Sequence, residues 1–156
     1  MANVIIDSCT YGKMIKDANW EKLVEEIIKT KSFIVFNFRV IRDELRKAPK
    51  QVLTIYDQIV STNMIQENKT IVKLAEGYYN EYKKNGGGKG KKKILNDFKI
   101  VACASIKNCD ILFSDDDSTL KCKNALDAYR KVNINMKYRT PKFYSILDLK
   151  STFLTS

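Results

Sequence analysis

The feature that most constrains the fold is an alternation of short apolar runs with longer segments whose apolar residues recur at helical spacing. Short runs with few polar interruptions are typical of strands buried on both faces of a sheet. We expect such strands at residues 3–6, 32–36 and 111–113, with a last one in the tail at 143–149. Strands that alternate with helices are joined by right-handed crossovers. The sequence therefore predicts a three-layer α/β/α fold with a mostly parallel central sheet.

The helical segments carry apolar residues three and four positions apart, as Val52, Ile55 and Tyr56 do. Pro49 should end the helix before it, because the residue preceding a proline disfavours helical geometry. Asn96 is a candidate N-cap for a helix that reaches about residue 108. Helices are expected near residues 20–28, 37–47, 52–60, 71–82, 96–108 and 118–131.

The length of 156 residues suits one domain with a full core, so we expect residues 1–156 to form a single domain. Lys and Arg number 28 against 18 Asp and Glu, which gives a net charge of +10. This excess favours an anionic partner, most often nucleic acid. The alternative is a lysine-rich surface that only keeps the protein in solution.

Histidine is absent from the sequence, which excludes Ser-His-Asp and Cys-His catalysis. Zinc is improbable, because no two of the four cysteines have a short paired spacing: Cys9, Cys103, Cys109 and Cys122. The first residues lack the features of a secretory signal, and no apolar stretch reaches membrane-spanning length. We therefore expect a cytoplasmic protein with reduced thiols, whose chemistry would use carboxylates, lysines, hydroxyls or a metal.

Acidic residues occupy four positions beside predicted strand ends or inside apolar helical stripes. Asp7 directly follows the first strand, and the three aspartates at 115–117 follow the strand at 111–113. Because parallel strands present their carboxyl ends at one edge of the sheet, these acids are expected to meet. Glu44 and Asp97 each interrupt an apolar helical face. Each acid alone is explained as well by a turn, a cap or, for Asp97, the dipole of a first helical turn. Together they favour a cation site, since a bare buried carboxylate is costly.

A site made of carboxylates suits Mg²⁺ or Mn²⁺, which prefer oxygen ligands. Ser8, Thr10 and Ser114 lie next to these acids in the sequence and are candidates to orient them or their waters. Ordinary capping of a helix or turn is an equally good explanation of the three hydroxyls.

Two basic segments are candidate contacts for RNA. Residues 83–93 are rich in lysine and glycine and are expected to form a flexible loop. Its candidate phosphate contacts, which would give salt-sensitive affinity, are Lys89, Lys91, Lys92 and Lys93. Residues 137–144 interleave basic and aromatic side chains, with Arg139 as the candidate contact. A passive linker and edge-strand packing are the respective alternatives.

The chain resembles the PIN-domain nuclease family in four segments that follow the family's order: VIIDS at 4–8, RDELR at 42–46, NDFKIVACA at 96–104 and ILFSDD at 111–116. The resemblance covers nearly the whole chain and departs from the compact members at the long stretch 51–93. It implies a PIN-like fold in which Asp7, Glu44 and Asp97 hold divalent metal and act in cleavage of single-stranded RNA.

The resemblance leaves the fourth acid open. The family's pattern of a hydroxyl, any residue and an acid puts Ser114 first and Asp116 last, so Asp116 is the expected catalytic acid. Asp115 remains an alternative metal ligand, and Asp117 is assigned to the start of the next helix.

The expected function is that of an Mg²⁺- or Mn²⁺-dependent endoribonuclease. The resemblance suggests the toxin of a VapBC-type toxin–antitoxin pair, with RNA as substrate, an antitoxin protein as partner and a homodimer as the assembly; a housekeeping RNA-processing role fits equally well. The alternative is a catalytically weak PIN-like module that binds RNA or a protein partner. A phosphatase-like hydrolase is disfavoured, because Asp7 is followed by Ser8 and Cys9 rather than by the Asp-x-Asp pattern.

Overall fold

The computed structural model describes residues 1–154 and contains a parallel sheet with the strand order β2-β1-β5-β6. Its strands are β1 (Ala2–Ile6), β2 (Phe33–Val35), β5 (Ile111–Phe113) and β6 (Lys142–Tyr144). A second pair of short parallel strands joins β3 (Asn37–Phe38) to β4 (Met64–Ile65). The predicted parallel sheet is thus confirmed, and β1 is buried at its centre, where Val4, Ile5 and Ile6 are at most 1% exposed.

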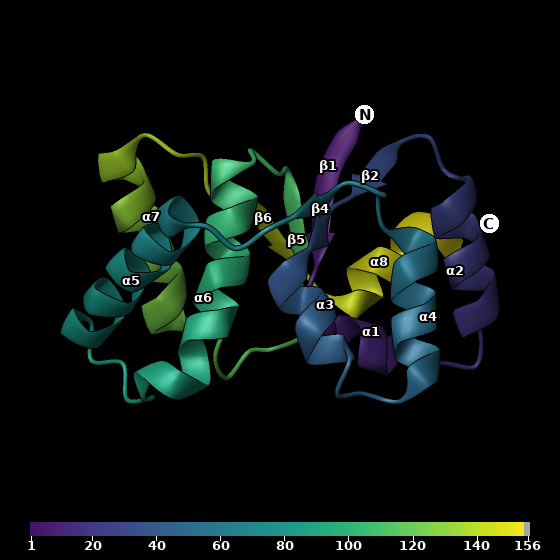
Figure 1. The fold of residues 1–156 in the computed structure, drawn as a ribbon, viewed down its shortest axis with the longest axis horizontal. Coiled ribbons are helices and arrows are strands. Elements are labelled where there is room, and N and C mark those ends of the chain that lie inside the picture. Colours follow the sequence, from purple (N-terminus) through teal and green to yellow (C-terminus); the bar gives the residue numbers. More distant parts are fainter. Residues whose placement is uncertain (155–156) are drawn as a thin grey trace.

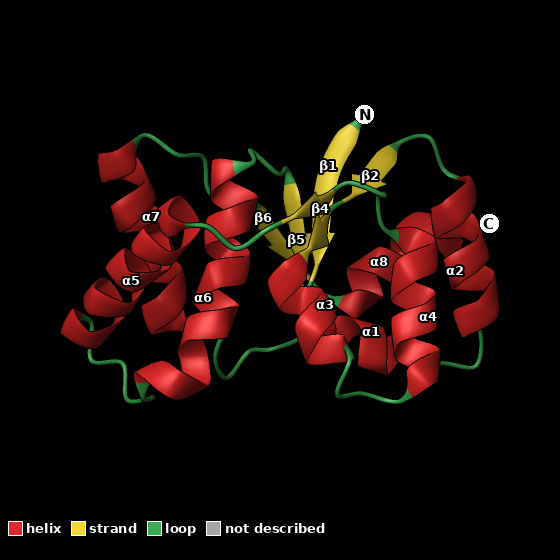
Figure 2. Ribbon diagram, in the orientation of Figure 1, coloured by secondary structure: helices red, strands yellow, loops and turns green. Residues whose placement is uncertain are grey.

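Helices stand on both sides of this sheet, as Figures 1 and 2 show. One group contains α5 (Lys69–Lys84), α6 (Lys91–Ile106) and α7 (Lys123–Met136). The other contains α1 (Ser8–Met14), α2 (Trp20–Lys29), α3 (Arg39–Leu45), α4 (Lys50–Ile59) and α8 (Ile146–Leu154). The three-layer α/β/α prediction is therefore confirmed. No helix within residues 1–154 has the length and apolar character of a membrane span.

The order of the strands places a crevice beside β1. The chain passes from β1 to β2 on one side, whereas β5 and β6 lie on the other. Such a reversal opens a crevice at the carboxyl ends of the two strands that flank it. Ile6 of β1 pairs with Phe113 of β5, so Asp7 and Ser114 leave the sheet side by side. The Asp7 amide donates a hydrogen bond to the Phe113 carbonyl at 3.0 Å, which fixes this junction.

An aromatic cluster holds α6 against its neighbours and thereby positions Asp97. Phe98, which follows Asp97 in α6, meets Tyr78 of α5 and Tyr129 of α7 edge to face, with ring centroids 6.5 and 5.5 Å apart. All three rings are fully buried. Rings in this arrangement attract one another beyond the effect of burial alone. The backbone that carries Asp97 is therefore rigidly placed.

Helix α6 begins at Lys91, so the prediction that Asn96 caps it is wrong. Gly90 is the N-cap of α6, and the three lysines that follow it form the first turn of the helix, as suits a residue with high helix propensity. Asp97 consequently lies in the second turn of α6. The helix dipole stabilises acids only within the first turn, so it does not explain why an acid stands at this position.

The segment at residues 83–93 contains more helix than the predicted loop would. Its first two lysines end α5, its last three begin α6, and Gly86 turns the chain with a φ of 92°. The Gly87 amide donates to the Tyr82 carbonyl at 2.9 Å, and a Cβ on Gly87 would lie 2.4 Å from the Tyr82 ring. The Lys89 amide donates to the Tyr82 hydroxyl at 3.0 Å. The glycines here allow a close approach to Tyr82 instead of forming a loose loop.

Helix α7 begins at Lys123 instead of 118, because Asp116 holds the preceding residues in a turn. Asp116 Oδ1 accepts hydrogen bonds from the amides of Ser118 and Thr119 at 3.2 and 2.9 Å. The Asp116 carbonyl accepts a hydrogen bond from the Lys121 amide at 2.8 Å. The assignment of Asp117 to the start of this helix was therefore wrong.

The C-terminal tail forms a strand only at 142–144 and then turns into α8. Ser145 and Asp148 form a capping box: the Ser145 amide donates to Asp148 Oδ2 at 2.8 Å, and the Asp148 amide donates to Ser145 Oγ at 3.3 Å. This reciprocal pair starts a helix where the apolar residues predicted a strand. Helix α1 was likewise not expected.

Candidate active site

Asp7 lies in the crevice between β1 and β5 and is only 3% exposed. Its Oδ2 accepts a hydrogen bond from the Ser114 hydroxyl at 2.5 Å, and its Oδ1 accepts one from the Thr10 hydroxyl at 2.7 Å. The Thr10 amide also donates to Oδ1 at 3.1 Å, so Asp7 is the N-cap of α1. Burial raises the pKa of Asp7, and the hydrogen bonds from Ser114, Thr10 and Cys9 counteract only part of that effect. The capping explanation of Asp7 is therefore confirmed, and its place in a cation site stays a prediction.

Glu44, on α3, faces the same space with a half-buried side chain. The Ser8 hydroxyl donates a hydrogen bond to its carboxylate, but Oε1 is buried and has no hydrogen-bond partner. Burial raises the pKa of Glu44, the Ser8 hydrogen bond lowers it, and the charge of Asp7 raises it further. A buried carboxylate oxygen without a partner is costly, and a proton or a cation would relieve that cost.

Thr119 connects the other two acids. Its hydroxyl lies 2.8 Å from Asp97 Oδ2 and also contacts Asp116 Oδ2. A hydroxyl donates only one hydrogen, so it serves one carboxylate at a time. Burial pushes the pKa of Asp116 upward, but hydrogen bonds from Thr119 and Ser118 outweigh it and the pKa falls below its ordinary value. Burial raises the pKa of Asp97 to about 7.

The pKa of Asp97 also shows that the four acids are close enough to interact. After burial and the opposing Thr119 hydrogen bond, it is raised by the charges of Asp116, Glu44 and Asp7. These residues come from the ends of β1 and β5 and from α3 and α6, which contact each other across the crevice. The structure thus brings together the four acids that the sequence singled out.

The remaining aspartates of the 115–117 run are engaged elsewhere. Asp115 Oδ1 accepts a hydrogen bond from the Ile146 amide at the start of α8, and Oδ2 pairs with Lys13 at 3.4 Å. Asp117 is 85% exposed and pairs with Lys121 at 3.2 Å. Asp116 is therefore the acid of this run that shares a partner with Asp97, and it also donates its amide to Ser114 Oγ at 3.0 Å.

The donor set fits a hard divalent cation in its chemistry. It consists of carboxylates and hydroxyls, includes the partnerless Glu44 Oε1, and holds carboxyls whose pKa values are raised in the absence of a counter-charge. In their present positions, no three Asp, Glu or Cys side chains within residues 1–154 are arranged to hold a metal ion together. Asp7, Asp97 and Asp116 direct oxygens to hydroxyls instead. Joint binding would require these side chains to turn from the hydroxyls toward the ion.

The fold is similar to that of a chain in a known crystal structure. The crystal structure of VapBC2 from Rickettsia felis bound to a DNA fragment from their promoter matches 92% of this chain and 98% of the matched chain, with a TM-score of 0.56. The fold is PIN-like. Sequence identity is 12%, so the likeness concerns the fold alone. No protein-family model matches the sequence, and no curated protein matches it.

The candidate RNA contacts lie in two places: the lysines lie on or next to the helix that carries Asp97, whereas Arg139 does not. Lys91, Lys92 and Lys93 form the first turn of α6, the helix that carries Asp97. Lys91 lies six positions before Asp97 in the helix, or about 9 Å along its axis. Lys91 pairs with Glu76 at 3.4 Å and lies 6.0 Å from the centroid of the Tyr79 ring. These lysines remain candidate contacts, and so does Lys89 in the adjoining turn.

Arg139 lies at the opposite end of the strands from the four acids, and its role as an RNA contact stays a prediction. It donates to Asp110 Oδ1 at 2.7 Å and to the Asn108 carbonyl at 2.8 Å, just before β5 begins. The acids follow the other end of that strand. The basic and aromatic pattern of residues 137–144 concealed this structural ion pair.

Sequence reasoning missed two side chains of the site. Thr119 has a local signal, because an Asp followed three residues later by a hydroxyl is typical of an Asp-capped turn. Its contact with Asp97, 22 residues away, has no local signal. Cys9 is the second: its Sγ lies 3.2 Å from both Asp7 carboxylate oxygens. Burial and the nearby Asp7 charge raise the pKa of Cys9 to about 12, so it donates as a neutral thiol.

Proposed function

We propose that this protein is a divalent-metal-dependent endoribonuclease that cleaves single-stranded RNA. The observation that carries the proposal is the convergence of four acids at the carboxyl ends of β1 and β5: Asp7, Glu44, Asp97 and Asp116. Their charges interact, since the charge of Asp7 raises the pKa of Glu44 and the charges of the other three raise the pKa of Asp97. Parallel α/β sheets bind ligands at this position. Four acids in a protein of net charge +10 are an unusual concentration of negative charge.

In this proposal, Asp7, Glu44, Asp97 and Asp116 hold Mg²⁺ or Mn²⁺, which would activate water and stabilise charge on the scissile phosphate. Ser114 and Thr10 fix the Asp7 carboxylate from both sides. Ser8 orients Glu44, and Thr119 keeps Asp97 and Asp116 together. Without a cation, the pKa of Asp97 is about 7; a bound cation would lower it, so metal binding near neutral pH would release a proton from the Asp97 carboxyl.

The excess of positive charge supports RNA as the substrate. Lysines at the start of α6 lie on the same helix as Asp97, and they would hold phosphates of the strand through contacts that need no base sequence. The acids themselves repel phosphates, so binding of RNA near them depends on the bound cation and on these lysines.

Cleavage of a fluorescent single-stranded RNA tests the proposal. Activity should require Mg²⁺ or Mn²⁺, stop with EDTA and be lost in Asp7→Asn and Glu44→Gln. Asp43→Asn is the matched control, because Asp43 neighbours Glu44 on α3 but is 53% exposed. It should retain full activity. Unchanged cleavage by folded Asp7→Asn would refute the proposal.

The likeness of fold to a chain of a VapBC2 structure supports a narrower proposal, that this protein is the toxin of a toxin–antitoxin pair. Its partner would be a small antitoxin protein whose Arg or Lys pairs with the four carboxylates in place of metal. Expression from an inducible promoter should arrest growth, whereas Asp7→Asn should not. Normal growth with abundant, RNA-cleaving protein would favour an RNA-processing role.

A catalytically weak RNA- or partner-binding module is the second candidate. It is favoured by one observation: in their present positions no three acids within the described residues are arranged around a common ion. RNA binding that persists without cleavage at millimolar Mn²⁺ would support this candidate.

A further inference from the structure

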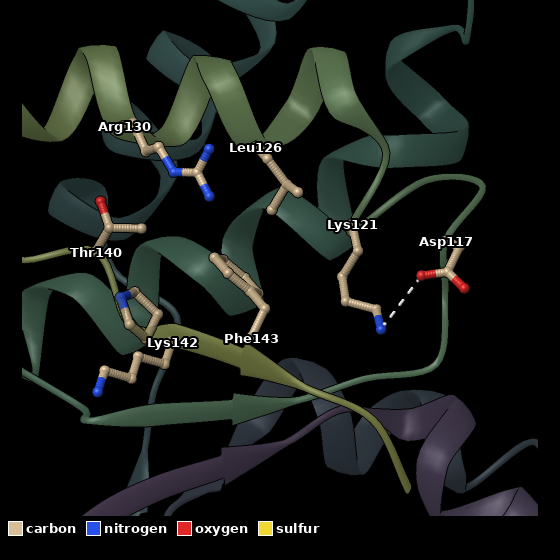
Figure 3. Close-up of a pocket in the computed structure, with 8 residues that line it drawn as sticks. Asp117, Lys121, Leu126, Arg130, Thr140, Lys142 and Phe143 are labelled. Atoms are coloured by element: carbon tan, nitrogen blue, oxygen red, sulfur yellow. Dashed lines mark ion pairs between the residues drawn. The ribbon is translucent and has the colours of Figure 1, made fainter. Parts of the chain in front are cut away.

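A basic groove is lined in part by the loop between β5 and α7, which contributes Asp117 and Lys121 (Figure 3). It has a volume of about 450 Å³ and runs between the start of α7 and β6. Its lining residues are Asp117, Lys121, Leu126, Arg130, Thr140, Pro141, Lys142 and Phe143. We propose that this groove binds the phosphate backbone and one base of the single-stranded RNA whose cleavage is proposed above.

The groove is apolar at its floor and positively charged at its two ends. Figure 3 shows Arg130 and Lys121 on either side of Leu126 and Phe143, whereas Lys142 extends away from them. Lys121 is only 14% exposed, so the protein holds its stem in place and leaves the ammonium group at the groove. Helix α7 starts beside it without a side-chain cap, and its unpaired first amides add to the positive potential.

Phe143 is suited to stack on an unpaired base. Its ring stacks on the fully buried Tyr129, with centroids 5.7 Å apart and planes inclined by 24°. The ring is therefore held rigidly while part of it lines the groove. Stacking on a fixed aromatic ring is the usual way in which proteins bind single strands without reading their sequence.

The cations of the groove are only weakly neutralised by the protein. Arg130 lies 3.9 Å from Asp127, and both side chains are at least half exposed. Lys121 pairs with Asp117, which is 85% exposed and free of other side-chain partners among the contacts described. Because the Asp117 side chain is exposed to solvent, its attraction to Lys121 is screened, and a phosphate can take its place at the ammonium group. Asp117 thus acts as a competitor of the RNA phosphate for Lys121.

Continuity with the acids distinguishes this groove from a random basic patch. Asp117 and Lys121 belong to the same short loop as Asp116 and Thr119, which contact each other at the acids. A strand bound along the groove would need to pass over this loop to reach the four carboxylates. The inference rests on the proposed nuclease function for its substrate, but the binding itself needs no catalysis.

Fluorescence anisotropy with a short single-stranded RNA in EDTA measures this binding without cleavage. For Lys121→Gln/Arg130→Gln, the slope of log affinity against log salt should fall by about 1.4, since each single-strand phosphate contact contributes about 0.7. Asp117→Asn should tighten binding roughly two- to fivefold at low salt, as expected for loss of a competing exposed pair. The charge-matched control is Lys22→Gln/Lys31→Gln, with one substitution on α2 and one just after it. It should lower the affinity less than Lys121→Gln/Arg130→Gln does, and this smaller loss should not depend on the length of the RNA.

An unchanged salt slope in folded Lys121→Gln/Arg130→Gln would overturn the proposal. If the double variant does not fold, Arg130→Gln alone, at a 61% exposed position, should still lower the slope by about 0.7. Duplex DNA that binds more tightly than the RNA and alone responds to these variants would also overturn it. Cleavage is assayed separately with Mn²⁺: cleavage without a slope change contradicts only the groove, whereas a slope change without cleavage contradicts only the nuclease.

Discussion

Replacement of Asp97 by Asn should make the metal-free protein more stable at pH 8, although it removes activity. The pKa of Asp97 is raised from 3.8 to about 7, first by burial and then by the charges of Asp116, Glu44 and Asp7. The folded state therefore binds a proton more tightly than the unfolded chain. The stabilisation that this proton provides is fully present below pH 3.8 and is lost as the pH rises through about 7.

The difference in pKa corresponds to about 4 kcal/mol in the free energy of unfolding, at 1.36 kcal/mol for each pH unit. This is an upper limit, because the four acids share the proton and their titrations are coupled. For a protein of this size, 1 kcal/mol shifts the melting temperature by roughly 2–4 °C. Asp97→Asn should thus melt up to roughly 10 °C above the wild type at pH 8, and close to it at pH 4.

Thermal unfolding in EDTA between pH 4 and pH 8 measures this effect as the difference between the two proteins. Carboxyls with lowered pKa values, such as Asp17 and Asp110, titrate equally in both and cancel. Mg²⁺ should raise the melting temperature of the wild type at pH 8 and leave Asp97→Asn nearly unchanged. Asp43→Asn should follow the wild type throughout. If the difference in melting temperature between the wild type and Asp97→Asn is the same at pH 4 and pH 8, the account of four coupled acids is refuted.

Three further predictions concern the surface, the turn and the assembly. Four lysines lie around the start of α6: Lys89, Lys91, Lys92 and Lys93. Replacing them with Gln should flatten the salt dependence of RNA binding and leave cleavage at saturating RNA nearly unchanged, whereas an unaltered slope would remove them as RNA contacts. Gly87→Ala should cost about 1–3 kcal/mol in urea unfolding, because its Cβ would lie 2.4 Å from the Tyr82 ring, whereas Gly88→Ala, which meets nothing within 4 Å, should cost less. The protein should be a homodimer in light scattering at tens of micromolar, through the faces of α2 and α4 next to the exposed Ile28 and Ile34. A monomer at that concentration would contradict the dimer and weaken the toxin proposal.

The sheet and the positions of the acids were predictable because both depend on burial. Residues 4–6 and 111–113 are apolar on both faces, which only a central strand of a parallel sheet requires. The acids that follow these strands must then share one edge. Helix boundaries were less predictable, since they depend on single hydrogen bonds. Asp7 starts α1 by accepting the Thr10 amide, and Ser145 with Asp148 starts α8 inside an apolar run.

Contacts between distant segments account for the rest of what the sequence concealed. Thr119 meets Asp97 across 22 residues, and nothing near either residue announces the contact. The three lysines from Lys91 were interpreted as part of a loop because of the glycines before them, yet their intrinsic helix propensity prevails once Tyr82 organises the turn. The pair of Arg139 with Asp110 also had no local signal, because the two residues are 29 positions apart.

The pairing of β1 with β5 has a consequence for synthesis of the protein. Ile6 and Phe113 are partners across most of the chain, and Ser114 meets Asp7 across 107 residues. A growing chain on the ribosome can fold α2, α4 and the α5–α6 hairpin from local contacts, but it cannot assemble the four acids until β5 and the following loop have emerged. Truncated chains that end before Asp116 would lack the complete set. The proposed nuclease activity therefore cannot arise before β5 and the loop that carries Asp116 have emerged from the ribosome and folded against β1.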